Sequence, residues 1–289
     1  MPELPEVETI KRGLMECCVG KKIRNVEILC EKSFLGPQNL IENATIVAIR
    51  RFGKALVIDL SNKVSMMIHL RMTGQIIYRA NAENLQGAFA GGHPTDSFLT
   101  ELPNKQTRVI FELDRGRIYF NDQRKFGFVK VLPTDEVEQD AFIAKLAPEP
   151  WDMTAQEFYD RLQKHKNMVI KAALLDQTVI CGLGNIYADE TLFDAGIHPE
   201  SRVGEISLED AERILIGAKS TMEASIKAGG STMATYVKSD GTKGNYLELF
   251  AQVFQRHGQE CRRCGAEIIK MRVAGRGTHC CINCQEKKI

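Results

Sequence analysis

Four cysteines near the C-terminal end of the chain have the spacing of a zinc site. Cys261 and Cys264 form one C-x2-C pair, and Cys281 and Cys284 form a second pair after sixteen intervening residues. Each pair presents two thiolates on one side of a tight turn, and two such turns complete a tetrahedron around Zn²⁺. Four protein ligands leave no open position on the metal, so the spacing predicts one structural zinc ion and catalysis elsewhere.

Two neighbours of the second pair leave a ligand exchange open, because Cys280 and His279 could each donate to the metal. The stretch between the pairs is typical of a β-hairpin whose turn is expected at 275–277. An odd total of nine cysteines, without a secretion signal, argues against a disulfide framework. The remaining cysteines stand in apolar contexts and are predicted to be core thiols: Cys17, Cys18, Cys30 and Cys181.

The N-terminus offers a different chemistry. Removal of Met1 before the small Pro2 would leave a secondary amine, which can attack an aldehyde carbon and form an iminium ion. Glu3 stands beside it as a possible general acid. Taken alone, proline and glutamate are more typical of the start of a helix than of a reactive site, so the residues by themselves favour the helix-start interpretation.

Composition is that of an ordinary globular protein, with 44% hydrophobic and 26% charged residues in a chain of 289. This length allows two domains and a small appendage. No apolar run is long enough for a membrane span or a signal peptide, so we expect a cytoplasmic protein. The net charge is only +1, yet the stretch 251–289 holds eight Lys or Arg against three acids, which weakly favours contact with phosphates.

The elements that must position these residues change in type along the chain. Val7, Ile10 and Leu14 predict a first helix. The stretch 82–103 is rich in Gly, Asn and Pro and is expected to be a surface loop. Short β-rich runs predict an antiparallel sandwich or barrel from strands near 22–29, 44–52, 55–60, 64–70, 108–113, 117–120 and 126–132.

Helical patterns follow the proline-rich stretch 148–150. Thr154 is predicted to cap one helix and Ser207 another, and Gly196 to end a helix that begins near 186. The predicted fold class is therefore α+β. We expect an N-terminal helix and β-sandwich domain, a linker, a helical domain and a zinc finger, with boundaries at 1–135, 136–150, 151–250 and 251–289.

A series of motifs spans the chain from Pro2 to Gln285 and resembles the formamidopyrimidine-DNA glycosylase family. In order they are PELPEVET, RRFGKALVIDL, HLRMTG, NDQRKFGF, LAPEP, LLDQTVICGLGNIYADETLFDAGIHP, GGST and AGRGTHCCINCQ. The resemblance implies a helix–two-turn–helix in the helical domain, which suits Asn185 directly after Gly184. It also implies bifunctional base-excision repair of oxidised purines such as 8-oxoguanine and formamidopyrimidines.

For catalysis, the resemblance implies that Pro2 attacks C1′ of the damaged nucleotide and that Glu3 acts as general acid. Lys54 resembles the lysine that assists β-elimination, and Arg276, expected at the hairpin tip, resembles the arginine that clamps a phosphate for δ-elimination. The product would be a one-nucleotide gap with phosphate ends.

For binding, the target base must leave the duplex before C1′ can be attacked. Met72 resembles the family's wedge, and Arg124 and Phe126 resemble residues that face the estranged base. The resemblance assigns phosphate or DNA contacts to His69, Asn185, Arg276 and Lys105, and Thr235 and Tyr236 are candidates to contact the flipped base. Partners are expected to be damaged double-stranded DNA and no membrane, with a monomeric enzyme associated with the nucleoid.

Two positions depart from the family pattern: Gln106 replaces a customary histidine, and Asn167 replaces a frequent lysine. They affect the expected affinity and lesion preference. Two alternatives remain. An endonuclease VIII type acting on oxidised pyrimidines usually has glycine in place of Leu4 and lacks the AGRGTH motif. A catalytically silent DNA-binding module would not need the four predicted catalytic residues together.

Overall fold

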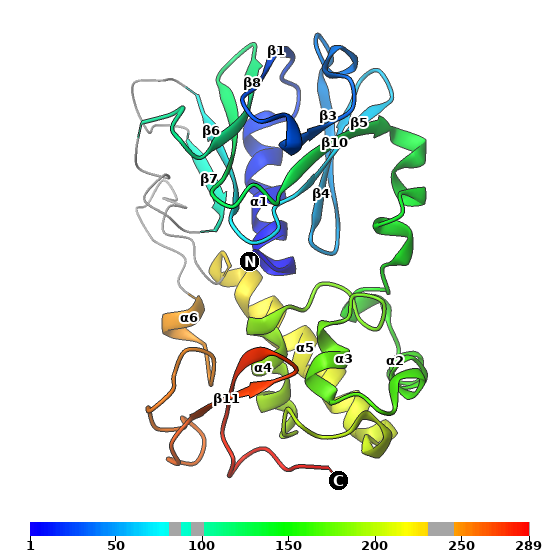
Figure 1. The fold of residues 1–289 in the computed structure, drawn as a ribbon, viewed down its shortest axis with the longest axis vertical. Coiled ribbons are helices and arrows are strands. Elements are labelled where there is room, and N and C mark those ends of the chain that lie inside the picture. The colour runs from blue at the N-terminus through cyan, green and yellow to red at the C-terminus, as the bar shows by residue number, and fades with distance from the viewer. Residues whose placement is uncertain (81–87, 94–100, 231–245, 289) are drawn as a thin grey trace. The chain divides into compact units, whose positions relative to one another are not determined.

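The computed structural model describes residues 1–80, 88–93, 101–230 and 246–288 (Figure 1). The chain divides into two compact units. Unit 1 comprises Met1–Ala144 and Ala228–Asn245, and unit 2 comprises Lys145–Lys227 and Tyr246–Ile289. The finer domain boundaries expected from the sequence remain predictions. In the part of the chain described, no helix is both long and apolar enough to cross a membrane.

Unit 1 begins with the predicted helix, α1 (Leu4–Cys18). Its apolar face is fully buried, as the spacing of Val7, Ile10 and Leu14 requires. The backbone N–H of Glu3 donates to the carboxylate of Glu6 at 2.8 Å, in a capping-box arrangement that fixes where the helix starts. α1 packs against strands of both sheets of this unit.

Two five-stranded sheets form the rest of unit 1. Neighbouring strands are antiparallel except β2 and β10, which are parallel. Buried side chains from both sheets and from α1 form one continuous apolar core, which makes this unit a sandwich. In spatial order, the first sheet is β1 (Ile23–Ile28), β8 (Thr107–Leu113), β9 (Arg117–Asp122), β6 (Gly74–Arg79) and β7 (Phe89–Gly92). The second is β2 (Phe34–Leu35), β10 (Phe128–Pro133), β5 (Val64–His69), β4 (Ala55–Leu60) and β3 (Ile46–Phe52).

The expected surface loop at 82–103 is wrong in its middle, because β7 is a buried strand paired with β6. Its glycines mark close packing rather than a loop. A Cβ on Gly91 would lie 2.4 Å from Cγ1 of Ile10 in α1. A Cβ on Gly92 would lie 2.4 Å from the carbonyl oxygen of Gly74 in β6. The flanking stretches 81–87 and 94–100 lie outside the described residues.

Unit 2 contains the expected helices and hairpin, and the predicted caps are present. The Thr154 hydroxyl accepts from the backbone of Glu157, and the Ser207 hydroxyl accepts from that of Asp210 at 3.1 Å. Gly196 ends α4 in the left-handed conformation. The elements are α2 (Ala155–Leu162), α3 (Ile170–Leu175), α4 (Asn185–Ala195), α5 (Leu208–Ala228), α6 (Tyr246–Leu249), β11 (Ile269–Val273) and β12 (Arg276–Cys280).

Short 3-10 helices connect several of these elements. They lie at Glu31–Ser33, Gln38–Leu40, Thr134–Gln139, Ile143–Lys145, Pro150–Asp152, Gln163–His165 and Val203–Glu205.

Candidate functional site

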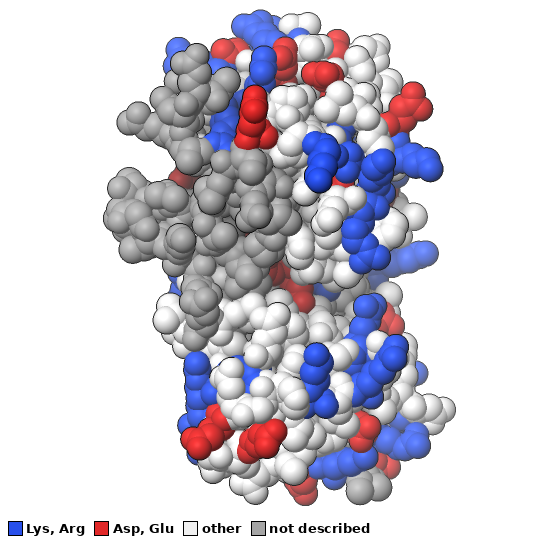
Figure 2. Space-filling model, turned by 60° about the vertical axis from the view of Figure 1, so that its left-hand side comes forward, with Lys and Arg blue, Asp and Glu red and all other residues white. Residues whose placement is uncertain are grey.

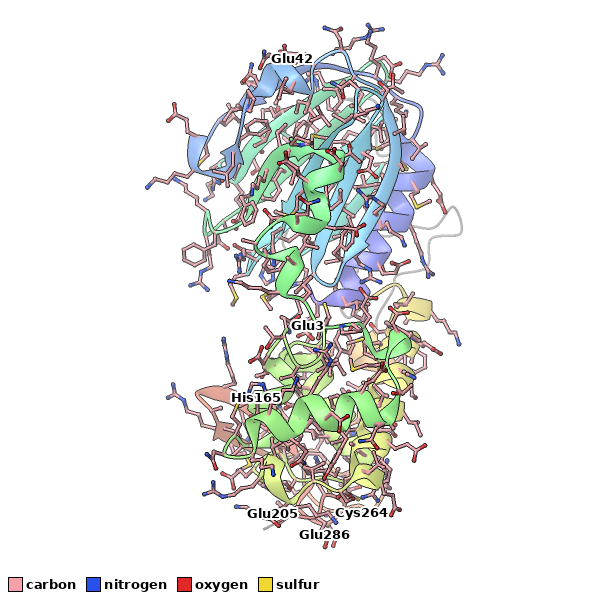
Figure 3. The ribbon with its side chains drawn as sticks, turned by 90° about the vertical axis from the view of Figure 1, so that its right-hand side faces the viewer. Glu3, Glu42, His165, Glu205, Cys264 and Glu286 are labelled. Carbon is pink, nitrogen blue, oxygen red and sulfur yellow. The ribbon has the colours of Figure 1, made fainter. Side chains whose placement is uncertain are left out.

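The predicted reagents at the N-terminus are held by the start of α1. Pro2 and Glu3 are both buried, whereas Met1 is 42% exposed. Figure 3 labels Glu3 at the N-terminal end of α1. Because Glu6 fixes the Glu3 backbone, the nitrogen of Pro2 has a defined position one residue earlier.

Lys54 lies in the turn between β3 and β4 and is buried. The preceding Arg51 connects this hairpin to α1, with its Nε 3.0 Å from the Glu8 carboxylate and its Nη1 3.2 Å from the Gly53 carbonyl oxygen. Burial raises the pKa of Glu8, but its ion pairs lower it more, so this pKa lies below its usual value. The ionised Glu8 thereby keeps the Lys54 turn against the first helix.

His69 ends β5, where it faces Ala55 of β4 in register, so it lies at the same end of the second sheet as Lys54. Burial, together with the positive charges of Arg71 and Lys54, lowers the pKa of His69 to about 3. Its Nδ1 accepts the backbone N–H of Arg71 at 3.0 Å, which leaves the proton on Nε2. His69 is therefore a neutral hydrogen-bond donor.

The three residues expected to replace a flipped base stand on two loops of unit 1. Met72 is 36% exposed on the loop between β5 and β6, so it is not a core residue. Phe126 is 55% exposed on the loop between β9 and β10, and the Arg124 guanidinium lies 4.8 Å from its ring centroid. Exposed apolar and planar groups on loops have the chemistry needed for insertion between bases.

Lys105 is exposed just before β8, in the run where Gln106 departs from the family pattern. Its carbonyl oxygen accepts from Nη1 of the buried Arg108 at 3.0 Å. Nε of Arg108 also donates to the Asp122 carbonyl oxygen at 2.7 Å. Arg108 thus fixes the backbone that carries Lys105 rather than reaching solvent itself.

The four predicted zinc ligands come together in unit 2, with their sulfur atoms all within 4.8 Å of one another. Sγ of Cys261 lies 3.9 Å from that of Cys284, and Sγ of Cys264 lies 3.5 Å from that of Cys281. A zinc tetrahedron with Zn–S bonds of about 2.3 Å has sulfur–sulfur edges of about 3.8 Å, which these distances match. The cluster therefore fits one structural Zn²⁺.

The open question of a ligand exchange is settled in favour of these four. Sγ of Cys280 lies 3.7 Å from the sulfur of Met271 and is not part of the cluster. The backbone N–H of His279 donates to the Asp189 carboxylate, and its Nδ1 lies 3.4 Å from the same group.

The hairpin turn expected at 275–277 is wrong: it starts one residue earlier and has two residues instead of three. Val273 pairs with Arg276, so the turn consists of Ala274 and Gly275, which have φ values of +47° and +77°. Two left-handed residues in a two-residue loop match the right-handed twist of the strands. Arg276 is consequently the first residue of β12, with its side chain exposed, rather than part of the turn.

A buried ion pair that the sequence did not reveal holds this hairpin. Nζ of Lys171 in α3 lies 2.6 Å from Asp189 in α4 and 2.7 Å from the Thr278 hydroxyl in β12. It also donates to the Gly277 carbonyl oxygen at 3.2 Å, and the Asn185 side chain donates to the same oxygen at 2.9 Å. Asn185 begins α4, so this network joins the strand that carries Arg276 to the N-terminus of a helix, the kind of helix end that favours anions in proteins generally.

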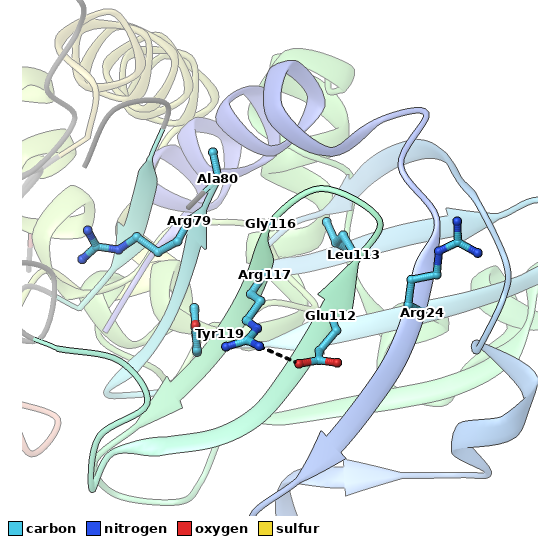
Figure 4. A pocket seen from close by; sticks show the side chains of 8 residues that line it. All are labelled: Arg24, Arg79, Ala80, Glu112, Leu113, Gly116, Arg117 and Tyr119. Atoms are coloured by element: carbon cyan, nitrogen blue, oxygen red, sulfur yellow. Dashed lines mark ion pairs between the residues drawn. The ribbon is translucent and has the colours of Figure 1, made fainter. Parts of the chain in front are cut away.

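A hollow of about 470 Å³ elsewhere in unit 1 is lined by Arg24, Arg79, Arg117, Tyr119 and others (Figure 4). Arg117 is paired there with Glu112 at 3.0 Å. This hollow lies at the end of β6 and β9 opposite the Met72 loop, and no predicted site residue lines it.

Surface charge is mixed, in keeping with the net charge of +1. Figure 2 shows Lys and Arg on the surface of both units, with Asp and Glu scattered among them. Thr235 and Tyr236, the candidates to contact a flipped base, lie outside the described residues.

Comparison with known proteins gives matches along the chain. The profile of the formamidopyrimidine-DNA glycosylase N-terminal domain matches residues 1–129, and that of the H2TH domain of the same enzyme matches 146–237. A zinc finger found in FPG and IleRS matches 258–287. The formamidopyrimidine-DNA glycosylase of an Exiguobacterium species is 37% identical over 295 residues, which cover 99% of this chain and 100% of the relative. That of a Synechocystis species is 37% identical over 304 residues, which cover 99% of each.

Solved structures of Lactococcus lactis Fpg are also similar. Its complex with DNA containing an abasic site has a TM-score of 0.84 at 33% identity, covering 99% of this chain and 100% of that one. A mutant bound to Fapy-dG-containing DNA has a TM-score of 0.84 at 34% identity and the same coverage. A complex of the wild-type enzyme with DNA containing an oxidised pyrimidine has a TM-score of 0.84 at 34% identity, again with the same coverage.

Proposed function

The chain belongs to the formamidopyrimidine-DNA glycosylase family, and from this premise we propose which of its residues excise a damaged base and cut the strand. It is a base-excision repair enzyme with glycosylase and abasic-site lyase activities. The proposed substrates are duplexes that contain an oxidised purine or an abasic site. The buried Pro2–Glu3 start of α1 carries the assignment of the chemistry.

Covalent catalysis is assigned to Pro2 once Met1 has been removed, since an amide nitrogen has no free electron pair for attack. The amine attacks C1′, the base leaves with a proton, and the sugar ring opens as Glu3 protonates its oxygen, giving an iminium ion. The capping of the Glu3 backbone by Glu6 supports this assignment, because it holds amine and carboxyl as neighbours at a fixed place.

Strand cleavage follows from the iminium ion, which makes the protons on C2′ acidic. We assign the proton transfers of β-elimination to Lys54 and the grip on the departing phosphate of δ-elimination to Arg276. The buried position of Lys54 suits proton exchange with the sugar. The exposed side chain of Arg276 suits contact with a phosphate of the DNA backbone.

DNA binding is assigned to two sets of residues. Met72, Arg124 and Phe126 fill the space that the everted nucleotide leaves, which suits their exposure on loops. His69 donates to a phosphate as a neutral imidazole. The other phosphate contacts are assigned to Lys105, Asn185 and Arg276.

The proposed lesions are 8-oxoguanine and formamidopyrimidines, with the enzyme acting as a monomer on nucleoid DNA. Purine preference is supported by the Lactococcus lactis relative solved with Fapy-dG-containing DNA. The same relative has also been solved with an oxidised pyrimidine, so pyrimidine lesions belong in the test as a second class.

Borohydride trapping on a panel of duplexes tests the proposal. Duplexes with 8-oxoguanine, a formamidopyrimidine, thymine glycol or an abasic site are incubated with enzyme and borohydride. We expect covalent complexes, with the purine lesions reacting faster than thymine glycol. Preference for thymine glycol would favour the endonuclease VIII type, and absence of trapping on every duplex would indicate a DNA-binding module without catalysis.

A further inference from the structure

We propose that Asp122 is a positioning residue for base eversion, which holds the Met72 loop and the Arg124–Phe126 loop as one wedge. This inference rests on the proposed function, because it explains how residues assigned to the space of the flipped base keep their places. Asp122 ends β9, is fully buried, and does not itself reach the surface.

The Asp122 carboxylate organises the loop that follows it. Its Oδ2 accepts the backbone N–H groups of Phe126 at 2.7 Å and Gly127 at 2.6 Å, and its Oδ1 accepts that of Arg124 at 3.1 Å. The loop therefore curls around one side chain. Arg124 and Phe126 point outward because their backbone N–H groups point inward.

The same carboxylate reaches the other loop through Thr73. The Thr73 hydroxyl donates to Oδ1 of Asp122 and accepts the backbone N–H of Arg124 at 3.0 Å. Thr73 directly follows Met72, so one hydroxyl connects the wedge methionine to the arginine of the second loop. The two loops are then a single hydrogen-bonded body rather than two independent tips.

A third segment meets the Asp122 backbone. The backbone N–H of Asp122 donates to the Gln106 carbonyl oxygen at 2.8 Å, and the Asp122 carbonyl oxygen accepts from Nε of Arg108 at 2.7 Å. Arg108 also holds the Lys105 carbonyl oxygen. All segments of the first sheet that carry a predicted DNA contact therefore converge on this one residue.

Sterics and backbone conformation agree with this role. A Cβ on Gly127 would lie 2.8 Å from the Phe120 ring and 3.2 Å from Oδ2 of Asp122, so a glycine lets the loop approach this closely. Arg71 and Lys125, one in each loop, have positive φ values of 51° and 57°. Left-handed non-glycine residues persist where the surroundings define the backbone, and the bonds to Asp122 supply that definition.

The chemistry requires aspartate in particular. Four groups of the described residues donate to its carboxylate, and all four are uncharged donors. An ionised carboxylate accepts in every direction, whereas the amide of asparagine would turn two of its own hydrogens toward these donors. Asp122→Asn thus keeps the size of the side chain and breaks the arrangement.

A positioning role for eversion differs measurably from a merely structural one. Filling the vacated space matters most when a paired base must be driven out of the duplex. A preformed abasic site has no base to expel, so its cleavage depends less on the wedge. Loosening the loops should slow excision of paired 8-oxoguanine more than cleavage of an abasic site.

The test compares Thr73→Val with Ser65→Ala in single-turnover assays. Ser65 lies at the other end of β5 and is buried, and its hydroxyl lies 2.6 Å from the Asp59 carboxylate, so its loss removes a bond of the same kind away from the wedge. We expect Thr73→Val to slow 8-oxoguanine excision about tenfold and abasic cleavage about twofold or less, while Ser65→Ala affects neither. Thr73→Ser should restore the rate, since it keeps the hydroxyl.

A spectroscopic readout separates wedge insertion from stability. With 2-aminopurine opposite an abasic site, the fluorescence rise on binding should be smaller for Thr73→Val and for Asp122→Asn than for wild type, at unchanged melting temperature for Thr73→Val. Equal slowing on both substrates, or equal behaviour of Thr73→Val and Ser65→Ala, would overturn the inference. If Asp122→Asn does not fold, the threonine series decides alone. Failure of wild type to trap on any duplex would instead contradict the proposed function.

Discussion

The wedge loops of unit 1 and the hairpin of the zinc finger perform comparable tasks by different physical means. In the proposed function, both present side chains to DNA at fixed positions. The wedge loops leave strands of a large apolar core and are held by the hydrogen bonds of Asp122. Among the residues that the structure describes, the finger forms a small apolar cluster around Val253 and Ile268, and two of the cluster's members, Cys261 and Cys281, are ligand cysteines.

The difference shows how the size of a core decides the means of positioning. A segment of some thirty residues buries too little apolar surface to define its own structure, so a metal or another staple is required. In the finger, zinc fixes the base of the hairpin, and Lys171 holds the strand that carries Arg276. In unit 1 the core is sufficient, and hydrogen bonds from uncharged donors to the Asp122 carboxylate complete the task.

The largest effect is expected from a change at Pro2, which should separate covalent catalysis by unit 1 from DNA binding by the finger. Pro2→Gly replaces the secondary amine and loosens the start of α1, so trapping on 8-oxoguanine DNA should fall about 1000-fold, or about 4 kcal/mol of transition-state stabilisation. DNA affinity, measured by fluorescence anisotropy, should stay close to wild type because the finger is unchanged. Equal trapping by both proteins would exclude Pro2 as the nucleophile.

In the finger we expect the opposite result, in which DNA binding is weakened while the catalytic amine is kept. Cys281→Ser, or removal of zinc by a chelator, should unfold the hairpin and weaken DNA binding about 100-fold or more, because the free energy of metal binding is what folds such a segment. The Pro2 amine remains, so trapping should reappear at high enzyme and DNA concentration. Zinc content and anisotropy check this prediction. Unchanged affinity without zinc would show that the finger has a sufficient core of its own.

A smaller effect is expected when the buried Lys171–Asp189 ion pair, which also holds the finger hairpin, is broken. Lys171→Met leaves Asp189 as an uncompensated buried charge, which should lower the free energy of unfolding by about 3–5 kcal/mol. Urea unfolding measures this, and Lys171→Met combined with Asp189→Leu should recover much of the loss. If the double variant were as unstable as the single one, packing around the ion pair rather than its charge would be the important term.

A lower pH should reduce the free energy of unfolding of unit 1 through a group that is not part of the zinc site. His69 has a lowered pKa of about 3, so below the unfolded value of about 6.5 the unfolded chain binds a proton that the folded one refuses. The contribution of His69 to the free energy of unfolding is therefore fully present above pH 6.5 and is lost as the pH falls toward 3. At pH 5 the loss is about 2 kcal/mol. His69→Asn should lack this part of the decline in urea unfolding between pH 7 and 5. Parallel declines in both proteins would contradict the assignment.

The smallest effect concerns the cysteine that is not a ligand. Cys280→Ala removes a buried thiol beside Met271, which should cost about 1 kcal/mol of stability or less and leave zinc content and cleavage unchanged. Loss of zinc from this variant would mean that Cys280 takes part in binding the metal.

Sequence patterns predicted those features that depend on spacing or on local caps. The cysteine pairs, the helix caps at Thr154 and Ser207, and most strands of the sandwich are confirmed. β7 was missed because its glycines, which allow close packing with Ile10 and Gly74, are also typical of loops. Glycine identity alone does not distinguish these causes.

Contacts between residues far apart in the sequence are the second kind of feature that the sequence patterns do not predict. Nothing local to Lys171 shows that it meets Asp189 and Thr278, because these contacts join three separate elements. Asp122 stands within the same NDQRKFGF motif as Arg124 and Phe126, but its carboxylate binds backbone N–H groups, which no residue pattern displays.

The turn of the finger hairpin has a consequence for protein engineering. Ala274 adopts a left-handed conformation that costs an L-residue with a Cβ about 1 kcal/mol, and its side chain is exposed. Asparagine or glycine tolerates this conformation, and Asn-Gly is the preferred sequence for such a two-residue loop. Position 274 is thus a place where a more heat-resistant repair enzyme can be obtained without altering a zinc ligand or Arg276.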